Sequence, residues 1–298
     1  MAAVDIDHLT KRYGPTLAVD DLSFRVEFGR IVGFLGPNGA GKTTTLRALL
    51  GLISPTAGTA TVEGRPFAEL EDPARTVGAV LDGGMLHPGR SGRNHLRMLA
   101  RSAGIGRRRV DDLLELVGLG GVADRRAGGY SLGMRQRLGL AAALLGDPRV
   151  LVLDEPANGL DPQGIRWLRD FLRSLAAEGR AVLVSSHVLA EVSQTAHEVV
   201  VIARGRSVAQ APLEELLATH AGGMRIAGPD AERLGQALRE DGAAVEPLRD
   251  GLLVHDRTGE QIGRVVAERQ LVISELAPVS SSLEEIFFEL TGEESEPA

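Results

Sequence analysis

The sequence predicts an α/β fold with a mainly parallel sheet, followed by a smaller α+β domain. Three observations lead to this prediction. Apolar strands alternate with amphipathic helices over residues 31–219, which is typical of a parallel sheet covered on both faces. A glycine-rich loop follows one of these apolar strands and precedes a helix. The pattern then changes near residues 220–223, which divides the chain into domains 1–221 and 222–298.

The composition narrows the classes of protein to which the chain can belong. Its 298 residues contain no cysteine, which excludes disulfides and thiol chemistry. The net charge is −7, whereas proteins that bind nucleic acid normally carry a basic excess, so we expect no nucleic-acid partner. No apolar run approaches the roughly 18 residues of a membrane span, and Met1–Asp7 lacks a signal-peptide core. If the protein serves a membrane, we therefore expect a peripheral subunit.

Domain 1–221 is expected to open with an antiparallel β layer. Its first strands, at 4–6 and 18–28, are joined by a turn at residues 13–15. A helical subdomain is expected at about 83–145. The apolar runs that predict strands are 31–35, 59–63, 77–81, 150–153, 181–185 and 199–202. The helical patterns are 93–103, 110–117, 132–145, 164–178, 189–196 and 212–219.

Domain 222–298 shows a different order of elements. Strands and helices are expected as βαββαβ, which is the order of a ferredoxin-like unit. An amphipathic last helix is expected at 282–290, and no chemistry is evident in this domain. We rank a role in stabilising a dimer first, ahead of binding a regulator or bracing the larger domain. The predicted elements are strand 224–227, helix 231–241, strands 244–248 and 252–255, helix 260–269 and strand 272–277.

Residues 31–47 are the most informative stretch. The apolar run Ile31–Leu35 predicts a strand, a helix is expected from about Gly41, and the pattern Gly-x4-Gly-Lys-Thr lies at their junction. Glycine permits positive φ and close approach of a ligand. The N–H groups of such a loop converge on an anion at the positive end of the following helix. The residues expected to bind the phosphates of a nucleotide are Gly36, Asn38, Gly39, Gly41, Lys42, Thr43 and Thr44.

A pair of carboxylates follows the buried strand at 150–153. Asp154 emerges at the carboxyl end of that strand, where parallel sheets bind ligands. Asp154 and the Thr43 hydroxyl are expected to hold Mg²⁺. Glu155 is expected to orient or deprotonate the attacking water. The sequence thus predicts a nucleoside triphosphate and Mg²⁺ as ligands and hydrolysis of the triphosphate as the reaction, while the alternative is an acidic strand end that caps the next element.

Further motifs resemble those of a known family. Residues 4–219 are similar to the ATP-binding subunit of an ABC transporter, a P-loop NTPase cassette with a signature helical subdomain. The stretch Tyr130–Arg137 resembles the family's signature motif, and Asn158–Asp161 resembles its D-loop. His187 matches the switch histidine. Tyr13 falls where the adenine-stacking aromatic belongs, although an aromatic in this place taken alone is more often a packed loop residue.

The resemblance implies roles for these motifs. Two cassettes of this family bind head to tail with ATP between them. Ser131, Gly133 and Asp161 would then contact the ATP that a second copy holds. His187 would contact the γ-phosphate and position the water together with Glu155. Lys42, Glu155 and His187 are therefore the expected catalytic residues.

Two departures from the family pattern concern the site. Asp82 stands where the family usually has a Gln that contacts Mg²⁺, so we add it to Thr43 and Asp154 as a metal ligand whose role is open. Leu132 stands where the signature motif has a glycine, and its bulk affects the approach of backbone to phosphate.

A third departure is the domain that follows residue 221. Together with residues 87–96 and 130–148, this domain resembles the daunorubicin- and bacitracin-resistance branch of exporters. This resemblance implies a homodimer beneath a separate transmembrane permease, which the loop Asp82–His95 would contact. The chain would lie in the cytoplasm, peripheral to the inner face of the cell membrane. The substrate is expected to be a drug or a peptide antibiotic, and the chain does not encode it.

Two other readings of the sequence remain. A soluble ABC ATPase could act on ribosomes or DNA, but the relatives that do so carry two cassettes or a long coiled-coil insertion. A nucleotide-binding regulator without turnover is a further alternative, which the intact Lys42, Asp154, Glu155 and His187 disfavour.

Overall fold

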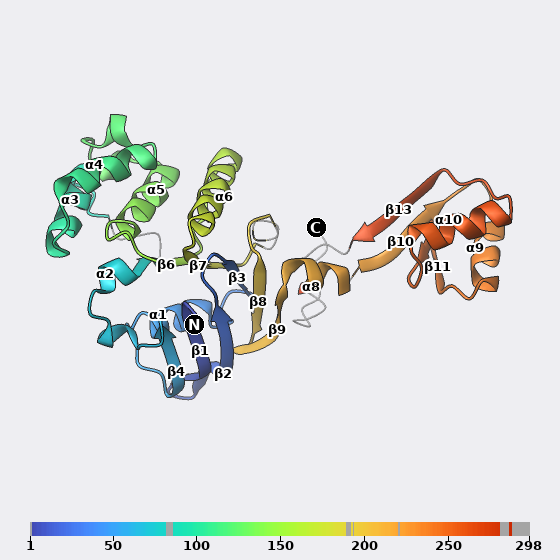
Figure 1. Cartoon of the computed structure of the whole chain (residues 1–298), viewed down its shortest axis with the longest axis horizontal. Coiled ribbons are helices and arrows are strands. Elements are labelled where there is room, and N and C mark those ends of the chain that lie inside the picture. The colour runs from blue at the N-terminus through green and yellow to red at the C-terminus, as the bar shows by residue number, and fades with distance from the viewer. Residues whose placement is uncertain are drawn as a thin grey trace. The chain divides into compact units, whose positions relative to one another are not determined.

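The computed structural model describes residues 2–81, 86–188, 192, 194–219, 221–280 and 286–287. The chain forms two compact units, Met1–Leu213 and Glu214–Ala298. Figure 1 traces the elements of each unit.

A sheet of six strands is the centre of the first unit, in the order β5-β6-β7-β3-β8-β9. All neighbours are parallel except β8 and β9. Every residue of β3, β6 and β7 is buried, as expected for strands that are covered on both faces. The strands are β3 (Ile31–Leu35), β5 (Val77–Val80), β6 (Val150–Asp154), β7 (Ala181–Ser186), β8 (Glu198–Ala203) and β9 (Arg206–Pro212).

Strand β9 was not expected from the sequence. Polar residues interrupt its apolar ones and all seven residues are half-buried or exposed, so it lacks the apolar run that marks the other core strands. It forms because β8 offers an unpaired edge, to which β9 adds antiparallel. The adjacent helix α8 (Leu213–Thr219) begins directly after it.

An antiparallel layer of three strands packs on the central sheet. Its order is β2-β1-β4, with β1 (Val4–Tyr13), β2 (Thr16–Val26) and β4 (Ala57–Val62). Phe24 of this layer and Phe34 of the central sheet lie with ring centroids 5.1 Å apart. Strand β1 is longer than its apolar start predicts, because it pairs with β2 on one side and β4 on the other.

Helices of the first unit fall into two sets. Helix α1 (Lys42–Leu49) follows β3, and α6 (Pro162–Ala177) follows β6. Figure 1 shows α3, α4 and α5 grouped together away from the antiparallel layer. Their core includes Leu96, Leu113 and Leu138. The other elements are η1 (Phe67–Glu69), α2 (Pro73–Thr76), α3 (Gly92–Ser102), α4 (Arg107–Leu116), η2 (Gly120–Val122), η3 (Ala127–Gly129) and α5 (Leu132–Ala143). The helix expected at 189–196 lies largely outside the described residues.

The second unit contains a four-stranded antiparallel sheet in the order β11-β12-β10-β13. Two helices pack on one face of it, where their side chains meet Ile226, Leu252 and Val254. The elements follow one another as strand, helix, strand, strand, helix, strand. They are β10 (Ala221–Ala227), α9 (Ala231–Glu240), β11 (Val245–Leu248), β12 (Gly251–Val254), α10 (Gly259–Glu268) and β13 (Glu275–Ser280).

The last strand of the second unit was predicted three residues too early. A strand was expected at 272–277, but the Val272 side chain is 70% exposed. Strand β13 instead begins at Glu275, where it pairs with Ala227 of β10. Of the helix expected at 282–290, only Ile286 and Phe287 are described, and both are helical and buried.

Candidate nucleotide-binding site

The loop between β3 and α1 has the backbone that the glycine pattern predicts. Gly39 and Gly41 have φ of 83° and 108°, in the region that favours glycine. A Cβ on Gly41 would lie 2.5 Å from the carbonyl oxygen of Ala18, so no larger residue fits there. Helix α1 begins at Lys42 without a side-chain cap. Its first N–H groups are therefore available to an anion.

Lys42 lies in the middle of this loop. Its side chain is 6% exposed, and Nζ donates to the carbonyl oxygens of Gly36, at 2.5 Å, and Pro37, at 3.2 Å. Nζ also lies 3.5 Å from Oε1 of Glu155. The ammonium group is thus held among acceptors at the position where the loop would receive phosphate.

Asp154 is held from two sides at the carboxyl end of β6. Thr43 Oγ1 donates to its Oδ2 at 2.8 Å, and Ser185 Oγ donates to its Oδ1. Ser185 stands opposite Asp154 in the register of β6 and β7. The same Ser185 Oγ accepts the N–H of Glu155 at 3.0 Å. Sequence reasoning missed this serine.

Glu155 turns back toward the loop. Its φ is 49°, in the left-handed region that is uncommon for residues other than glycine, and such backbone strain is often found at functional sites. Its Oε2 lies 2.7 Å from Nδ1 of His187, while Oε1 faces Lys42. One carboxylate therefore joins a histidine and a lysine that come from different strand ends.

A second group of predicted residues lies where α5 and α6 begin. Ser131 caps α5 by accepting the N–H of Met134 at 3.3 Å, and Asp161 caps α6 by accepting the N–H of Gly164 at 2.7 Å. Both residues, together with Gly133, line a cavity of about 520 Å³. The side chain of Leu132 lies over Gly159, where an added Cβ would come within 2.2 Å of Leu132 Cδ2.

The remaining predicted residues are Tyr13, Asn38, Thr44 and Asp82. Tyr13 ends β1 with 47% of its surface exposed, and Nζ of Lys11 lies 4.9 Å from its ring centroid. Asn38 is exposed in the loop, and Thr44 is half-buried in the first turn of α1. Asp82 lies outside the described residues, so its expected contact with Mg²⁺ stays a prediction.

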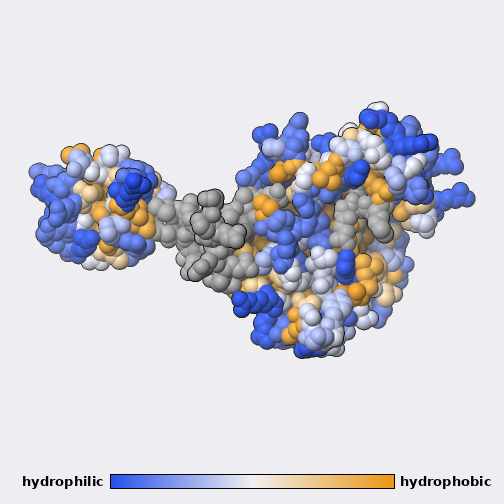
Figure 2. All heavy atoms as spheres, turned by 180° about the vertical axis from the view of Figure 1, so that it is seen from behind, coloured by the Kyte–Doolittle hydropathy of each residue, from blue (hydrophilic) through white to orange (hydrophobic). Residues whose placement is uncertain are grey.

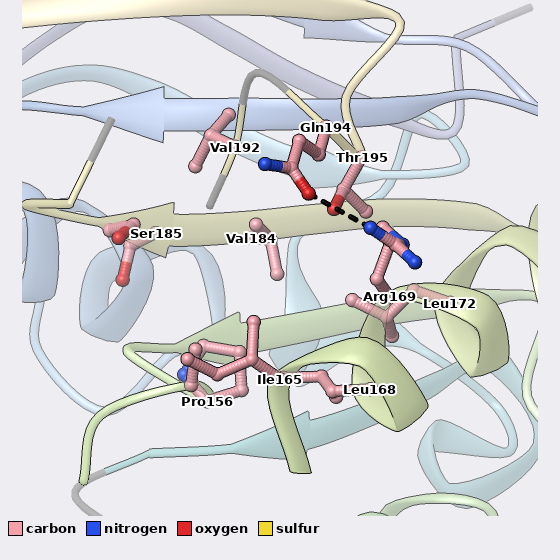
Figure 3. A pocket seen from close by; sticks show the side chains of 12 residues that line it. Pro156, Ile165, Leu168, Arg169, Leu172, Val184, Ser185, Val192, Gln194 and Thr195 are labelled. Atoms are coloured by element: carbon pink, nitrogen blue, oxygen red, sulfur yellow. Dashed lines mark hydrogen bonds between the residues drawn. The ribbon is translucent and has the colours of Figure 1, made fainter. Parts of the chain in front are cut away.

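A smaller cavity of about 240 Å³ lies behind Ser185, between β7 and α6 (Figure 3). Its lining is mainly apolar, with Ile165, Leu168 and Val184 on facing elements. Arg169 donates to Oε1 of Gln194 at 2.8 Å at one side of the cavity. Ser185 lines this cavity, and its hydroxyl binds Asp154. It therefore lies between the polar site and the apolar cavity.

Comparisons with known families cover both units. Residues 19–158 match the sequence model of the ABC transporter family. Residues 222–284 match a domain of unknown function (DUF8746).

Relatives resemble the chain over nearly its whole length. An uncharacterized ABC transporter ATP-binding protein, YhcH of Bacillus subtilis, is 35% identical, with 98% of this chain and 97% of the relative covered. The bacitracin transport ATP-binding protein BcrA of Bacillus licheniformis is 36% identical, with 95% of each covered. The Nod factor export ATP-binding protein I of Paraburkholderia xenovorans is 38% identical, with 98% of each covered.

Solved structures share the fold of the first unit. The ATP-binding subunit of an ABC transporter superposes with a TM-score of 0.66 at 27% identity, over 73% of this chain and 92% of that structure. The dimeric bacterial cassette MJ0796, at 22% identity, has the same fold, with a TM-score of 0.65 over 70% of this chain and 98% of its own. With its phosphate loop, its strand-end carboxylates and these relatives, the chain belongs to the ATP-binding subunits of ABC transporters, a family of ATPases.

Proposed function

We propose that this subunit powers export of a drug or a peptide antibiotic through a separate transmembrane permease. The observation that carries the enzymatic part is the contact of Glu155 with both His187 and Lys42. The exporter part is supported by relatives whose names give bacitracin transport and Nod factor export.

The residues around Thr43 fit a magnesium ion that accompanies ATP. Mg²⁺ prefers oxygen ligands and is usually held by one or two protein groups together with phosphate oxygens and water. The Thr43 hydroxyl and an oxygen of Asp154 lie 2.8 Å apart, and the phosphate loop adjoins them. When bound, the ion would neutralise charge on the phosphates. Ser185 would keep the Asp154 carboxylate turned toward Thr43.

Glu155 is suited to act on the attacking water. Its carboxylate would accept a proton from a water molecule while the water oxygen bonds to the γ-phosphorus and the bond from that phosphorus to the bridging oxygen breaks, which yields ADP and phosphate. His187, 2.7 Å from Glu155, would orient that water and the γ-phosphate. Lys42 would compensate the negative charge that moves onto the leaving ADP.

A second copy would complete the site. The start of α5 offers the Ser131 hydroxyl and free N–H groups near the backbone of Gly133, and Asp161 lines the same cavity. We propose that these residues close over the ATP of a partner copy in a head-to-tail dimer. ATP would then hold the two cassettes together, and hydrolysis would release them.

The chain is proposed to reach the membrane through its permease, at the cytoplasmic face. Over the described residues, the structure contains no helix that is both long and apolar enough to cross a bilayer. The described part of the expected permease contact is 86–95, where Ser91 caps α3. His95 in that helix is 8% exposed, so it supports the segment from within rather than by direct contact.

We further propose that residues 222–298 are an accessory domain after the cassette 1–221, and that this domain stabilises the dimer. It has a hydrophobic core of its own, which includes Leu234, Leu238 and Ile262. Among the described residues, several of its titratable groups form ion pairs, as His255 does with Glu246 at 3.1 Å.

A pull-down from native membranes tests the transporter proposal. Tagged Glu155→Gln protein, with ATP and Mg²⁺, is expected to recover a polytopic membrane protein in a ratio near one to one. Tagged Lys42→Ala protein is the control, because it lacks the phosphate-binding charge and is expected to recover less. Recovery of ribosomes, nucleic acid or the chain alone would contradict the exporter assignment.

A further inference from the structure

Positive charge is concentrated in the helical part of the first unit. Residues 86–145 contain eleven arginines, no lysine and four carboxylates, which gives this segment a net charge of +7. The whole chain carries −7, so the other residues together carry −14. Figure 2 shows hydrophilic side chains, in blue, projecting from this part of the molecule at the upper right.

Most of these arginines are exposed and unpaired. Arg93 takes up two of the four carboxylates, since it pairs with both Asp111 and Asp124. In the described part of the chain, seven exposed arginines of this segment form no ion pair. They are Arg97, Arg101, Arg107, Arg108, Arg125, Arg126 and Arg135.

Four of the eleven arginines lie on α3 or near its start. Arg97 and Arg101 are one turn apart on its exposed face, while Leu96 and Ala100 on the other face are buried. Arg90 and Arg126 line a polar cleft of about 500 Å³ together with Asn94, one turn before Arg97.

We call these four residues the arginine surface: Arg90, Arg97, Arg101 and Arg126. Its apolar neighbour Met98 is 43% exposed, and its sulfur accepts from Nη1 of Arg90 at 3.0 Å. This contact ties the cleft to the middle of α3. The arginine surface therefore has exposed apolar area beside its charges.

We propose that the arginine surface binds the anionic phospholipid headgroups of the membrane on which the subunit works. This inference rests on the proposed function for its orientation, because segment 86–95, the expected permease contact, runs directly into α3. Guanidinium groups bind phosphate oxygens through paired N–H donors. Basic side chains are attracted to the negative surface of the cytoplasmic leaflet over about a Debye length.

A nucleic-acid partner fits this surface less well. Proteins that bind single strands stack the bases on exposed aromatic rings. Segment 86–145 contains one aromatic residue, Tyr130, and it is 3% exposed. The negative charge elsewhere in the chain does not prevent contact with lipid, since the Debye length is about 8 Å at physiological ionic strength.

Flotation with vesicles tests the proposal on the full chain without any permease. One set of vesicles is phosphatidylcholine alone, and in the other phosphatidylglycerol replaces a third of it. The parent is expected to bind the anionic vesicles at least about tenfold more tightly, and to be released as salt is raised. The variant Arg97→Gln/Arg101→Gln/Arg126→Gln is expected to bind the anionic vesicles at least about tenfold more weakly. Each arginine near an anionic surface contributes about fivefold to the affinity.

A matched control separates local charge from total charge. Arg233, Arg239 and Arg249 are exposed in the second unit and form no ion pair within the described residues. Their triple change to Gln removes the same charge and is expected to leave vesicle binding unchanged. Both triple variants should keep the ATPase rate of the parent, which shows that they are folded.

Several results would overturn the proposal. These are equal binding to both kinds of vesicle, parental binding by the Arg97→Gln/Arg101→Gln/Arg126→Gln variant, binding only to vesicles that contain the permease, or binding to RNA but not to vesicles. A chain that hydrolyses ATP but fails to float refutes this inference alone. A chain that floats through the arginine surface but hydrolyses no ATP refutes the proposed function and leaves the lipid surface standing.

Discussion

Asp154 and Glu155 share one hydroxyl group. Ser185 Oγ donates to the Asp154 carboxylate and accepts the backbone N–H of Glu155, so it fixes both residues with a single side chain. Hydrogen bonds to charged groups contribute about 1.5–3 kcal/mol. Removing this hydroxyl should therefore loosen the proposed metal ligand and the proposed base together.

Changing Ser185 to Ala is expected to lower the kcat of ATP hydrolysis about tenfold, with a smaller change in KM. The Ser174→Ala variant is the control, because Ser174 Oγ donates only to the carbonyl oxygen of Phe171 within its own helix. Steady-state ATPase assays measure both. A parental kcat in Ser185→Ala would show that the hydroxyl does not position the site.

His95 makes stability depend on pH. Burial, helped by the charge of Arg90, lowers its pKa, and its Nδ1 has no hydrogen-bond partner among the described residues. Below the ordinary histidine pKa of about 6.5 the unfolded chain takes up a proton and the folded chain does not. The stability that neutral His95 contributes is thus complete above about pH 6.5 and is lost as pH falls toward the lowered pKa.

The variant His95→Leu is expected to lose less stability than the parent between about pH 7.5 and about pH 5.5. Trp167, the single tryptophan, reports unfolding of the first unit by its fluorescence. Urea midpoints at the two pH values give the comparison. An equal drop in parent and variant would rule out His95 as the source.

The sequence was informative about the site where one short stretch contains a complete chemical pattern. Lys42, Thr43, Asp154 and Glu155 could be found because glycine spacing and an apolar strand end mark them locally. Ser185 could not be found in this way, since its contact with Asp154 depends on which strands are neighbours. A search for hydroxyl residues at the ends of the other predicted core strands would have included it.

At the scale of elements, the strands that were predicted closely are marked by their own sequence, whereas the missed or shifted strands depend on their neighbours. The buried strands β3, β6 and β7 were predicted closely because they are short continuous apolar runs. Strand β9 was missed and β13 was shifted, because edge strands are fixed by their neighbours rather than by their own pattern.

The start of α5 contacts the loop before α6 through Leu132, which departs from the family's signature motif. Leu132 replaces a glycine of the resembled signature motif and lies over Gly159. Gly159 has φ of 71°, so an alanine there would be strained as well as crowded. Substitutions at Leu132 and at Gly159 are therefore expected to have coupled effects on stability.

A double-mutant cycle of Leu132→Ala and Gly159→Ala should show this coupling. The two changes together are expected to destabilise less than the sum of the separate changes, by about 0.5 kcal/mol or more, because Leu132→Ala removes the clash. The measurement is urea unfolding followed by Trp167 fluorescence. Gly121, with nothing within 4 Å of an added Cβ, supplies the control, and Gly121→Ala should be additive with Leu132→Ala. Additive energies for Gly159 would contradict the contact.

At the scale of the whole molecule, the chain separates into two units with independent cores. The composition break near residues 220–223 indicated this division, whereas the first compact unit ends at residue 213 and the second begins at residue 214. Helix α8 accounts for the difference, because the sequence assigned it to the first domain whereas all of it after Leu213 belongs to the second unit.

Removal of residues 222–298 tests the proposed role of the second unit. We expect the truncated chain to bind ATP but to need more ATP for half-maximal dimerisation than the full chain. Light scattering during an ATP titration gives both curves, and fluorescence of Trp167 checks that the first unit is folded. Identical titrations would remove dimer stabilisation as the function of the accessory domain.

The most direct test of the central claim is the mass of the Glu155→Gln chain in solution with ATP and Mg²⁺. The account predicts that the mass doubles, because ATP is bound but not hydrolysed and holds two cassettes together. In the same background, Ser131→Asn keeps the helix cap and should still dimerise, whereas Ser131→Asp keeps the cap but repels phosphate and should stay single. Hydrolysis at the parental rate by Glu155→Gln, a single mass with ATP bound, or a dimer that survives Ser131→Asp would contradict the account.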